Sequence, residues 1–298
     1  TVFDASNGDF KLKGGFTLSA PIGGEVWAVG ESRNITWTTA GSVANIKLEY
    51  STDGGSTYPN VIIATTPNSG SFAWTIPDVI STTLKVRVSD VNDATALNTS
   101  GGNFKIRGSL LLSAPNGTEG WPIGTTQTIA WTKTGSIANV KLEYSTDSGL
   151  TYPSLIVAST PADPLPADNA GSYAWVIPDN QSATARVRVT DVSDSTVLDT
   201  SNANFKLQGV LTLTAPNGAE VWIVGSSYNI TWTKLGAITN VKLQYSTDSG
   251  TTWPDPGKVI TASTAAALLS YTWTIPDDIS NTVRVRITDT GDTSVFDD

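Results

Sequence analysis

The sequence contains no cysteine, no histidine and no methionine. Without cysteine the chain can form no disulfide, no thiolate metal site and no cysteine nucleophile. Without histidine it lacks the commonest general base, the usual zinc ligand and the serine–histidine–aspartate triad. These absences exclude the most frequent catalytic arrangements, and we therefore expect a protein that is not an enzyme.

Positive charge is also scarce. The chain has 18 Lys and Arg residues against 27 Asp and Glu residues, which gives a net charge of −9 and a pI near 4.5. Nucleic acids and anionic membrane surfaces are bound by basic patches, and no apolar run approaches the roughly 20 residues that span a bilayer. We expect neither a nucleic-acid partner nor insertion into a membrane.

The sequence does contain a threefold repeat. A stretch of the form Pro-x-Gly-x-x-x-Trp-x-x-Gly occurs at residues 21–30, 115–124 and 216–225, so its starts are 94 and 101 residues apart. That spacing is too long for a solenoid repeat and suits one small domain. We divide the chain accordingly into an N-terminal segment (1–14), unit 1 (15–108), unit 2 (109–209) and unit 3 (210–298).

Within each unit, apolar residues alternate with polar ones. In unit 1, Ile46, Leu48 and Tyr50 fall on one face of an extended chain and Lys47 and Glu49 on the other, which is typical of a strand with one buried face. The same reasoning predicts seven strands in unit 1, at residues 16–21, 33–39, 45–51, 60–66, 71–76, 84–90 and 103–107. Short strands with regular turns and no helical period predict an all-β fold of three tandem antiparallel β-sandwiches, of the immunoglobulin or fibronectin type III kind.

Tryptophan recurs at three positions in each unit. Trp37 and Trp74 lie on predicted strands of unit 1, and we expect them in its core. Trp27, Trp121 and Trp222 lie in the first long loop of their units, where they either stack on a sugar or pack against the edge of the sandwich. We favour packing and keep a cell-surface glycan as an alternative partner.

The joints between the units are short. Only one or two residues, as at Gly108 and Gly209, separate the last strand of one unit from the first strand of the next. A joint of this length cannot act as a flexible spacer. We therefore predict a semi-rigid rod.

The ends of the chain are out of phase with the units. Residues 10–14 (Phe-Lys-Leu-Lys-Gly) match the last strand of unit 2 at residues 205–209 (Phe-Lys-Leu-Gln-Gly), whereas unit 3 stops before a strand of this kind. Either the sequence is part of a longer array, which we favour, or the N-terminal strand of one copy is donated to unit 3 of the next, in a head-to-tail filament. Both hypotheses predict that this segment seeks a partner through Val2, Phe3, Phe10 and Leu12. The expected partners are copies of the chain or further repeats.

A pair of aspartates follows the sixth predicted strand of every unit. The pairs are Asp90 and Asp93, Asp191 and Asp194, and Asp289 and Asp292. Two carboxylates with nearby carbonyl groups are candidate calcium ligands. Aspartates that only form turns are the favoured alternative, and we expect no other cofactor.

A second motif, Ser-x-Asp-x-Gly-x-Thr-aromatic, occurs at residues 51–58, 145–152 and 246–253. It resembles the Asp-box of sialidases and other β-propellers, where it is a hairpin turn away from the catalytic residues. A propeller is not implied, because the repeat is twice the length of a blade. We interpret the motif as a structural turn in which Asp and Gly serve the backbone.

The proline–glycine–tryptophan motif, followed by Asn34-Ile-Thr-Trp37 and Leu48-Glu-Tyr-Ser51, resembles an immunoglobulin-like module. The module occurs in fungal Ser/Thr-rich GPI-anchored cell-wall proteins and as tandem repeats in large bacterial surface or secreted proteins. The resemblance implies an extracellular or cell-surface location and a structural or adhesive role, and it transfers no catalytic residue. We therefore predict a segment of an extracellular rod, stalk or filament. The alternative is a carbohydrate-binding accessory array.

Overall fold

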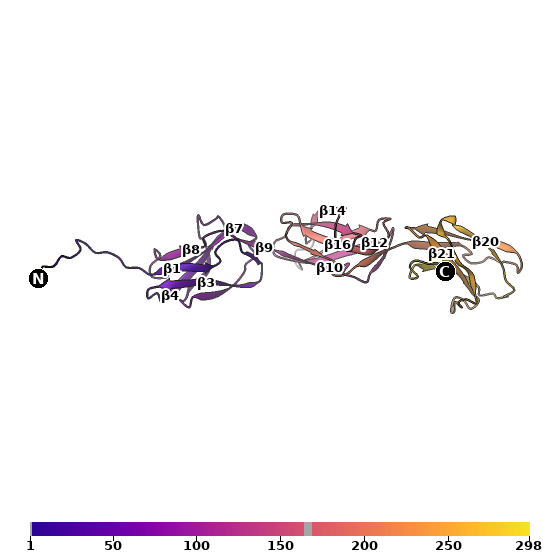
Figure 1. Cartoon of the computed structure of the whole chain (residues 1–298), viewed down its shortest axis with the longest axis horizontal. Coiled ribbons are helices and arrows are strands. Elements are labelled where there is room, and N and C mark those ends of the chain that lie inside the picture. The colour runs from indigo at the N-terminus through magenta and orange to yellow at the C-terminus, as the bar shows by residue number, and fades with distance from the viewer. Residues whose placement is uncertain (1, 164–168) are drawn as a thin grey trace.

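The computed structural model describes residues 2–163 and 169–298, so residue 1 of the N-terminal segment lies outside the described chain. The three units form three β-sandwiches that follow one another in a row, and the N-terminal segment extends away from the first of them (Figure 1). The predicted all-β fold of three repeated sandwiches is confirmed.

The strands of unit 1 are β1 (Gly15–Ala20), β2 (Val26–Ala28), β3 (Ser32–Ala40), β4 (Asn45–Ser51), β5 (Asn60–Pro67), β6 (Ser71–Thr75), β7 (Ser81–Asp90), β8 (Leu97–Thr99) and β9 (Phe104–Arg107). Those of unit 2 are β10 (Ser109–Ala114), β11 (Gly120–Pro122), β12 (Thr126–Thr134), β13 (Asn139–Ser145), β14 (Ser154–Pro161), β15 (Ala170–Val176), β16 (Ser182–Asp191), β17 (Leu198–Thr200) and β18 (Phe205–Gln208). Unit 3 consists of β19 (Val210–Ala215), β20 (Ser227–Leu235), β21 (Asn240–Ser246), β22 (Val259–Ala265), the 3-10 helix η1 (Ala266–Leu268), β23 (Ser270–Thr274), β24 (Arg284–Asp289) and β25 (Phe296–Asp297).

Each complete sandwich combines a three-stranded sheet with a larger one. In unit 1 the orders are β1-β3-β6 and β2-β9-β7-β4-β5, with β8 paired to β7, and unit 2 repeats this arrangement. All seven predicted strands are present. The sequence did not predict β2 and β8, because three residues are too few to show alternation. The predicted antiparallel pairing also needs one correction, since β9 pairs antiparallel with β7 but parallel with β2.

Every unit has a hydrophobic core of its own. Trp37 and Trp74 are buried in unit 1, as predicted. The indole N–H of Trp37 donates to Asn68 Oδ1 at 2.7 Å, and that of Trp131 in unit 2 donates to the Ala162 carbonyl at 3.0 Å. A buried indole N–H needs such an acceptor, so the recurrent tryptophan is satisfied inside each core.

Unit 3 differs from the other two at one edge. Its larger sheet has the order β22-β21-β24-β25, and no described strand stands where β9 and β18 stand in units 1 and 2. Tyr245 pairs with Val285 as Tyr144 pairs with Val187, which makes Ser280 the counterpart of Ser182. Nevertheless β16 begins at Ser182 and β24 only at Arg284. The sheet is shortened where its neighbouring strand is missing.

Candidate functional site: the joints between units and the open edge of unit 3

The same ion pair occurs at three places along the chain. Lys105 on the last strand of unit 1 reaches Asp194 of unit 2 at 2.5 Å. Lys206 on the last strand of unit 2 reaches Asp292 of unit 3 at 2.8 Å. Lys11 of the N-terminal segment reaches Asp93 of unit 1 at 2.6 Å. In each case a lysine that precedes a unit binds the turn after β7, β16 or β24 of that unit. We call this contact the joint.

The next polar side chain on each of these strands makes a second contact with the same turn. Arg107 donates to the Thr196 carbonyl at 3.1 Å, Gln208 donates to Ser294 Oγ at 2.8 Å, and Lys13 donates to the Thr95 carbonyl at 2.6 Å. Alternation along the strand explains the spacing, because neighbouring side chains point to opposite faces. On β9 and β18 the apolar residues face the core of their own unit while the polar ones contact the following unit.

The joint between units 1 and 2 has an additional contact. Asp78, in the loop after β6, accepts hydrogen bonds from the backbone N–H of Ser136 at 2.9 Å and from its hydroxyl at 2.6 Å. The counterpart of Ser136 in unit 3 is Ala237, which has no hydroxyl group to donate. The joint between units 1 and 2 is therefore held both at Asp194 and at Ser136 of unit 2.

A glycine links the units at each joint because the following unit packs closely against it. A Cβ on Gly108 would lie 2.8 Å from Ile137 Cδ1, and a Cβ on Gly209 would lie 2.8 Å from Ile238 Cδ1. Real Cβ atoms do not approach other carbons this closely, since packed carbon atoms stay about 3.5–4 Å apart. The short linker is fixed by packing as well as by the polar contacts.

The structure assigns the six predicted calcium ligands to turns and joints. Asp90, Asp191 and Asp289 each accept a hydrogen bond from the backbone N–H two residues further on, at 2.8–2.9 Å. Their partners Asp93, Asp194 and Asp292 bind a hydroxyl of their own turn and a lysine of the joint. No cluster of three or more acidic side chains that could hold a metal occurs among residues 2–163 and 169–298.

The first tryptophan of each unit packs against the last strand. Trp27 and Trp121 are only 7% and 8% exposed, and their rings lie 4.9 and 5.1 Å from those of Phe104 and Phe205. Both side chains therefore pack against the last strand of their unit, which is the interpretation that the sequence favours. Trp222 in unit 3 is partly buried and stacks on Tyr228 at 5.0 Å instead.

The place of the missing strand in unit 3 is a cleft of about 920 Å³. We call it the open edge, made of residues 220–224 on one side and 279–285 on the other. Trp222, Trp273 and Val283 are among the residues that line it, and Val283 is 44% exposed. In units 1 and 2 the counterparts of Val283 are Leu84 and Ala185. Both are fully buried, and they pair with Phe104 and Phe205 on the last strands.

The N-terminal segment has the opposite defect. Phe10 and Leu12 are 76% and 87% exposed, and Val2 and Phe3 are also exposed. Their counterparts in unit 2, Phe205 and Leu207, are buried. The segment therefore makes the contacts of the joint through Lys11 and Lys13, while Phe10 and Leu12 stay exposed.

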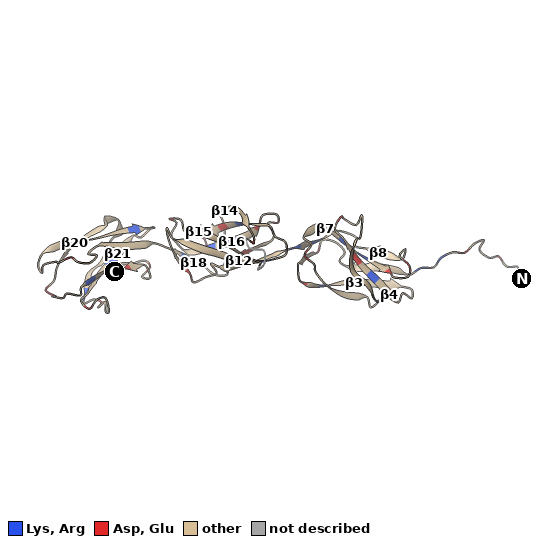
Figure 2. Ribbon diagram, turned by 180° about the vertical axis from the view of Figure 1, so that it is seen from behind, with Lys and Arg blue, Asp and Glu red and all other residues tan. Residues whose placement is uncertain are grey.

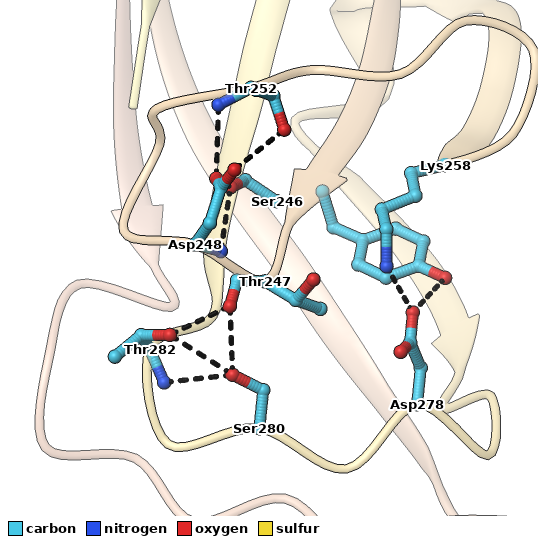
Figure 3. A network of polar contacts seen from close by, with 9 residues as sticks. Ser246, Thr247, Asp248, Thr252, Lys258, Asp278, Ser280 and Thr282 are labelled. Atoms are coloured by element: carbon cyan, nitrogen blue, oxygen red, sulfur yellow. Dashed lines mark hydrogen bonds and ion pairs between the residues drawn. The ribbon is translucent and has the colours of Figure 1, made fainter.

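The Asp-box motifs are turns, as interpreted from the sequence. In unit 3, Asp248 accepts hydrogen bonds from Ser246 Oγ at 2.5 Å, Thr252 N at 3.0 Å and Thr252 Oγ1 at 2.6 Å (Figure 3). The hydroxyls of Ser246 and Thr252 lower the pKa of Asp248 to about 2. The neighbouring Thr247 carbonyl accepts from Ser280 at 3.0 Å and from Thr282 at 2.7 Å, so this turn also anchors one side of the open edge.

Charged side chains are scattered along the ribbon, and most of it carries other residue types (Figure 2). Several of the cations are paired within the larger sheets, as Arg87 is with Glu49 at 2.7 Å and Arg188 with Glu143 at 2.8 Å. No helix among the described residues is long and apolar enough to cross a membrane.

Sequence analysis missed the lysines of the joint. Each lies between a phenylalanine and an apolar residue in a repeated Phe-Lys-apolar-polar stretch, at residues 10–13, 104–107 and 205–208. The aspartates that bind them recur with the same period. The shared period of the lysines and aspartates is the signal in the sequence that points to their contact. Alternation alone shows on which face of the strand a lysine lies, but it does not show which unit that face contacts.

Comparison with known proteins gives a coarse likeness to tandem domains. No family model matches the sequence, and no curated protein matches it. A solved 3Ig structure of titin domains is 8% identical, with 94% of this chain and 95% of that chain covered and a TM-score of 0.31. Fibronectin(III)-like modules of Clostridium thermocellum CbhA are 16% identical, with 64% and 92% covered and a TM-score of 0.22. A Dscam isoform is 10% identical, with 96% and 71% covered and a TM-score of 0.28. These values carry no argument about function, and the details of the fold rest on the strand pairing described above.

Proposed function

We propose that this chain is a non-enzymatic segment of an extracellular rod, in which tandem immunoglobulin-like sandwiches are held in line by a repeated joint. The observation that carries the proposal is the occurrence of one lysine–aspartate contact at three equivalent positions. A chain of independent modules would not need the same polar contact between each last strand and the next unit.

The joint acts on geometry more than on stability. Partly exposed ion pairs contribute only about 0.2–1 kcal/mol each, and the Lys105 and Asp194 side chains are partly exposed. Several such contacts around one tightly packed glycine nevertheless restrict the rotation of one sandwich relative to the next. The task of the segment is therefore to keep a fixed spacing, or to bear load, along the axis of the rod.

The composition supports an extracellular location for the rod. The chain has no cysteine or methionine to oxidise, and its surface polarity comes largely from hydroxyl and amide side chains. Its partners are further units of the same kind, and a glycan-binding role has no support at the buried Trp27 and Trp121.

The proposal is tested by measuring distances between spin labels placed on units 1 and 2 by pulsed electron paramagnetic resonance. The unsubstituted chain should give one narrow distance distribution. Lys105→Ala with Arg107→Ala should broaden it severalfold, because both polar contacts of the strand are lost. Lys47→Ala with Lys85→Ala is the matched control, since it removes two charges from unit 1 away from the joint. An equally narrow distribution in the joint variant would contradict the proposal.

A further inference from the structure

The joint between units 1 and 2 (the first joint) and the joint between units 2 and 3 (the second joint) hold the same lysine contact, but the residues around that contact differ. We propose that the first joint is stiff, whereas the second is a hinge at which the rod bends. Units 1 and 2 then move as one body, and unit 3 swings against them. The inference rests on the proposed function, because it concerns how that rod responds to load.

The first joint has an attachment that the second lacks. Asp78 of unit 1 accepts hydrogen bonds from the backbone N–H and from the hydroxyl of Ser136 in unit 2. A paired contact of this kind fixes an angle as well as a distance. The counterparts at the second joint are Asp179 and Ala237, and no hydrogen bond joins these two in the described part of the chain. The second joint is therefore free to rotate where the first is tied.

The polar contacts of the two last strands also end on different kinds of group. Arg107 donates to the backbone carbonyl of Thr196, which moves only with its sandwich. Gln208 donates instead to side-chain atoms, Ser294 Oγ at 2.8 Å and Asp292 Oδ2 at 3.4 Å. A side-chain acceptor can follow a moving donor by changing its χ angles. The contacts of the second joint therefore survive a change of angle between the units.

A cleft of about 300 Å³ lies between units 2 and 3 at the second joint. Lys206 of unit 2 lines it from one side, and Thr239 and Asp292 of unit 3 line it from the other. Several of the lining residues are smaller than their counterparts at the first joint, among them Gln208, Ala237 and Gly291 in place of Arg107, Ser136 and Ser193. Close-packed atoms resist displacement, so the cleft gives unit 3 room to tilt.

The wall of this cleft is polar and contains an unsatisfied acceptor. The side-chain oxygen Oε1 of Gln181 is buried there without a hydrogen-bond partner among the described residues. Water normally satisfies an acceptor in such a place, and a polar cavity of this size has room for it. Water bridges form at many angles between two polar groups, so this side of the joint does not lock one orientation.

An apolar contact supplies the pivot. Ile123 of unit 2 is buried, and a Cβ on Gly236 of unit 3 would lie 2.9 Å from its Cδ1. Hydrophobic contact is non-directional, so unit 3 can roll on Ile123 without losing it. The Lys206–Asp292 pair and the packed Gly209 keep the two units together during this movement.

Pulsed electron paramagnetic resonance of two doubly labelled chains tests the inference. One chain carries spin labels at Thr38→Cys and Thr132→Cys in units 1 and 2, and the other at Thr132→Cys and Thr233→Cys in units 2 and 3. These threonines are equivalent and exposed, and the chain has no cysteine of its own. We expect the distance distribution between units 2 and 3 to be at least about twice as wide as that between units 1 and 2, because fewer directional contacts hold unit 3.

Rebuilding the first joint within the second gives a matched test. Ala237→Ser with Gln208→Arg restores the hydroxyl and the guanidinium of the first joint, and it should narrow the distribution between units 2 and 3. Thr251→Arg, in the exposed turn at the other end of β21, is the control and should leave this distribution unchanged. The reverse exchange, Asp78→Ala with Arg107→Gln, should widen the distribution between units 1 and 2.

Two narrow distributions of equal width in the unsubstituted chain would overturn the inference and leave the proposed function standing. Two broad ones would contradict the proposed function instead, so the two failures are distinguishable. The hinge would also be refuted by a rebuilt second joint that stays as wide as before while the chain keeps its unfolding temperature.

Discussion

The clearest consequence of the structure concerns two phenylalanines in nearly the same sequence. Phe205 in unit 2 is 1% exposed, whereas Phe10 in the N-terminal segment is 76% exposed. Both are followed by Lys-Leu. We expect Phe205→Ala to destabilise unit 2 strongly and Phe10→Ala to leave the stability of the monomer unchanged.

The magnitude follows from the buried area. A phenylalanine side chain buries about 200 Å², which at about 25 cal/mol per Å² corresponds to about 5 kcal/mol as an upper bound. Observed losses for Phe→Ala in cores are about 3–5 kcal/mol. Small domains have unfolding free energies of about 5–15 kcal/mol, so Phe205→Ala removes a large share of the stability of unit 2.

The assay is differential scanning calorimetry of the intact chain, at a dilution where it is monomeric, with urea unfolding followed by tryptophan fluorescence. Phe205→Ala should lower one of the unfolding transitions and leave the others in place. The reasoning would be refuted by a loss of less than about 1 kcal/mol for Phe205→Ala, or by an equal loss for Phe10→Ala in the monomer.

Three further predictions concern the turns and the joints. The pKa of Asp147 is lowered to about 2 by the hydroxyls of Ser145 and Thr151. The stabilising effect of the ionised carboxylate is complete above about pH 4 and is lost as the pH falls towards 2. Between pH 5 and pH 2 the unfolding temperature should therefore fall less steeply for Asp147→Asn than for the unsubstituted chain. Ser136→Ala should widen the spin-label distance distribution between units 1 and 2 while changing the unfolding free energy by less than about 0.5 kcal/mol, whereas Ser42→Ala, its exposed counterpart in unit 1, should change neither. Gly209→Ala should bend the joint between units 2 and 3, because the new Cβ would lie 2.8 Å from Ile238 Cδ1. Small-angle X-ray scattering should then give a shorter maximum dimension for the chain. Gly257→Ala should leave this dimension unchanged, because its Cβ would lie 3.6 Å from the nearest atom, Pro254 Cβ.

The sequence predicted the sandwich fold because alternation and turns are local signals. Ile46, Leu48 and the other inward residues of the long strands could be assigned from their neighbours alone. The short strand around Trp27 could not, because its burial depends on Phe104, which is distant in the sequence. Polar neighbours such as Glu25 make this loop look exposed in the sequence, whereas in the structure it pairs with the last strand.

The candidate site could be predicted only in part. The repeat phase predicts that the N-terminal segment has a partner, reached through Val2, Phe3, Phe10 and Leu12, and these four side chains are exposed. The joint could not be found in the same way, since Lys105 and Asp194 belong to different units and their contact depends on how two rigid bodies meet. From the sequence, Asp194 is interpreted as a turn residue, with calcium binding as the alternative, because a sequence shows the charge of a carboxylate and not its partner.

The central claim is that the joint fixes each sandwich relative to the next. The distribution of spin-label distances between units 1 and 2 tests this claim most directly. We predict one narrow distribution for the unsubstituted chain, which Lys105→Ala with Arg107→Ala broadens severalfold. A distribution that is already broad in the unsubstituted chain, or one that stays narrow in this variant, would contradict the account.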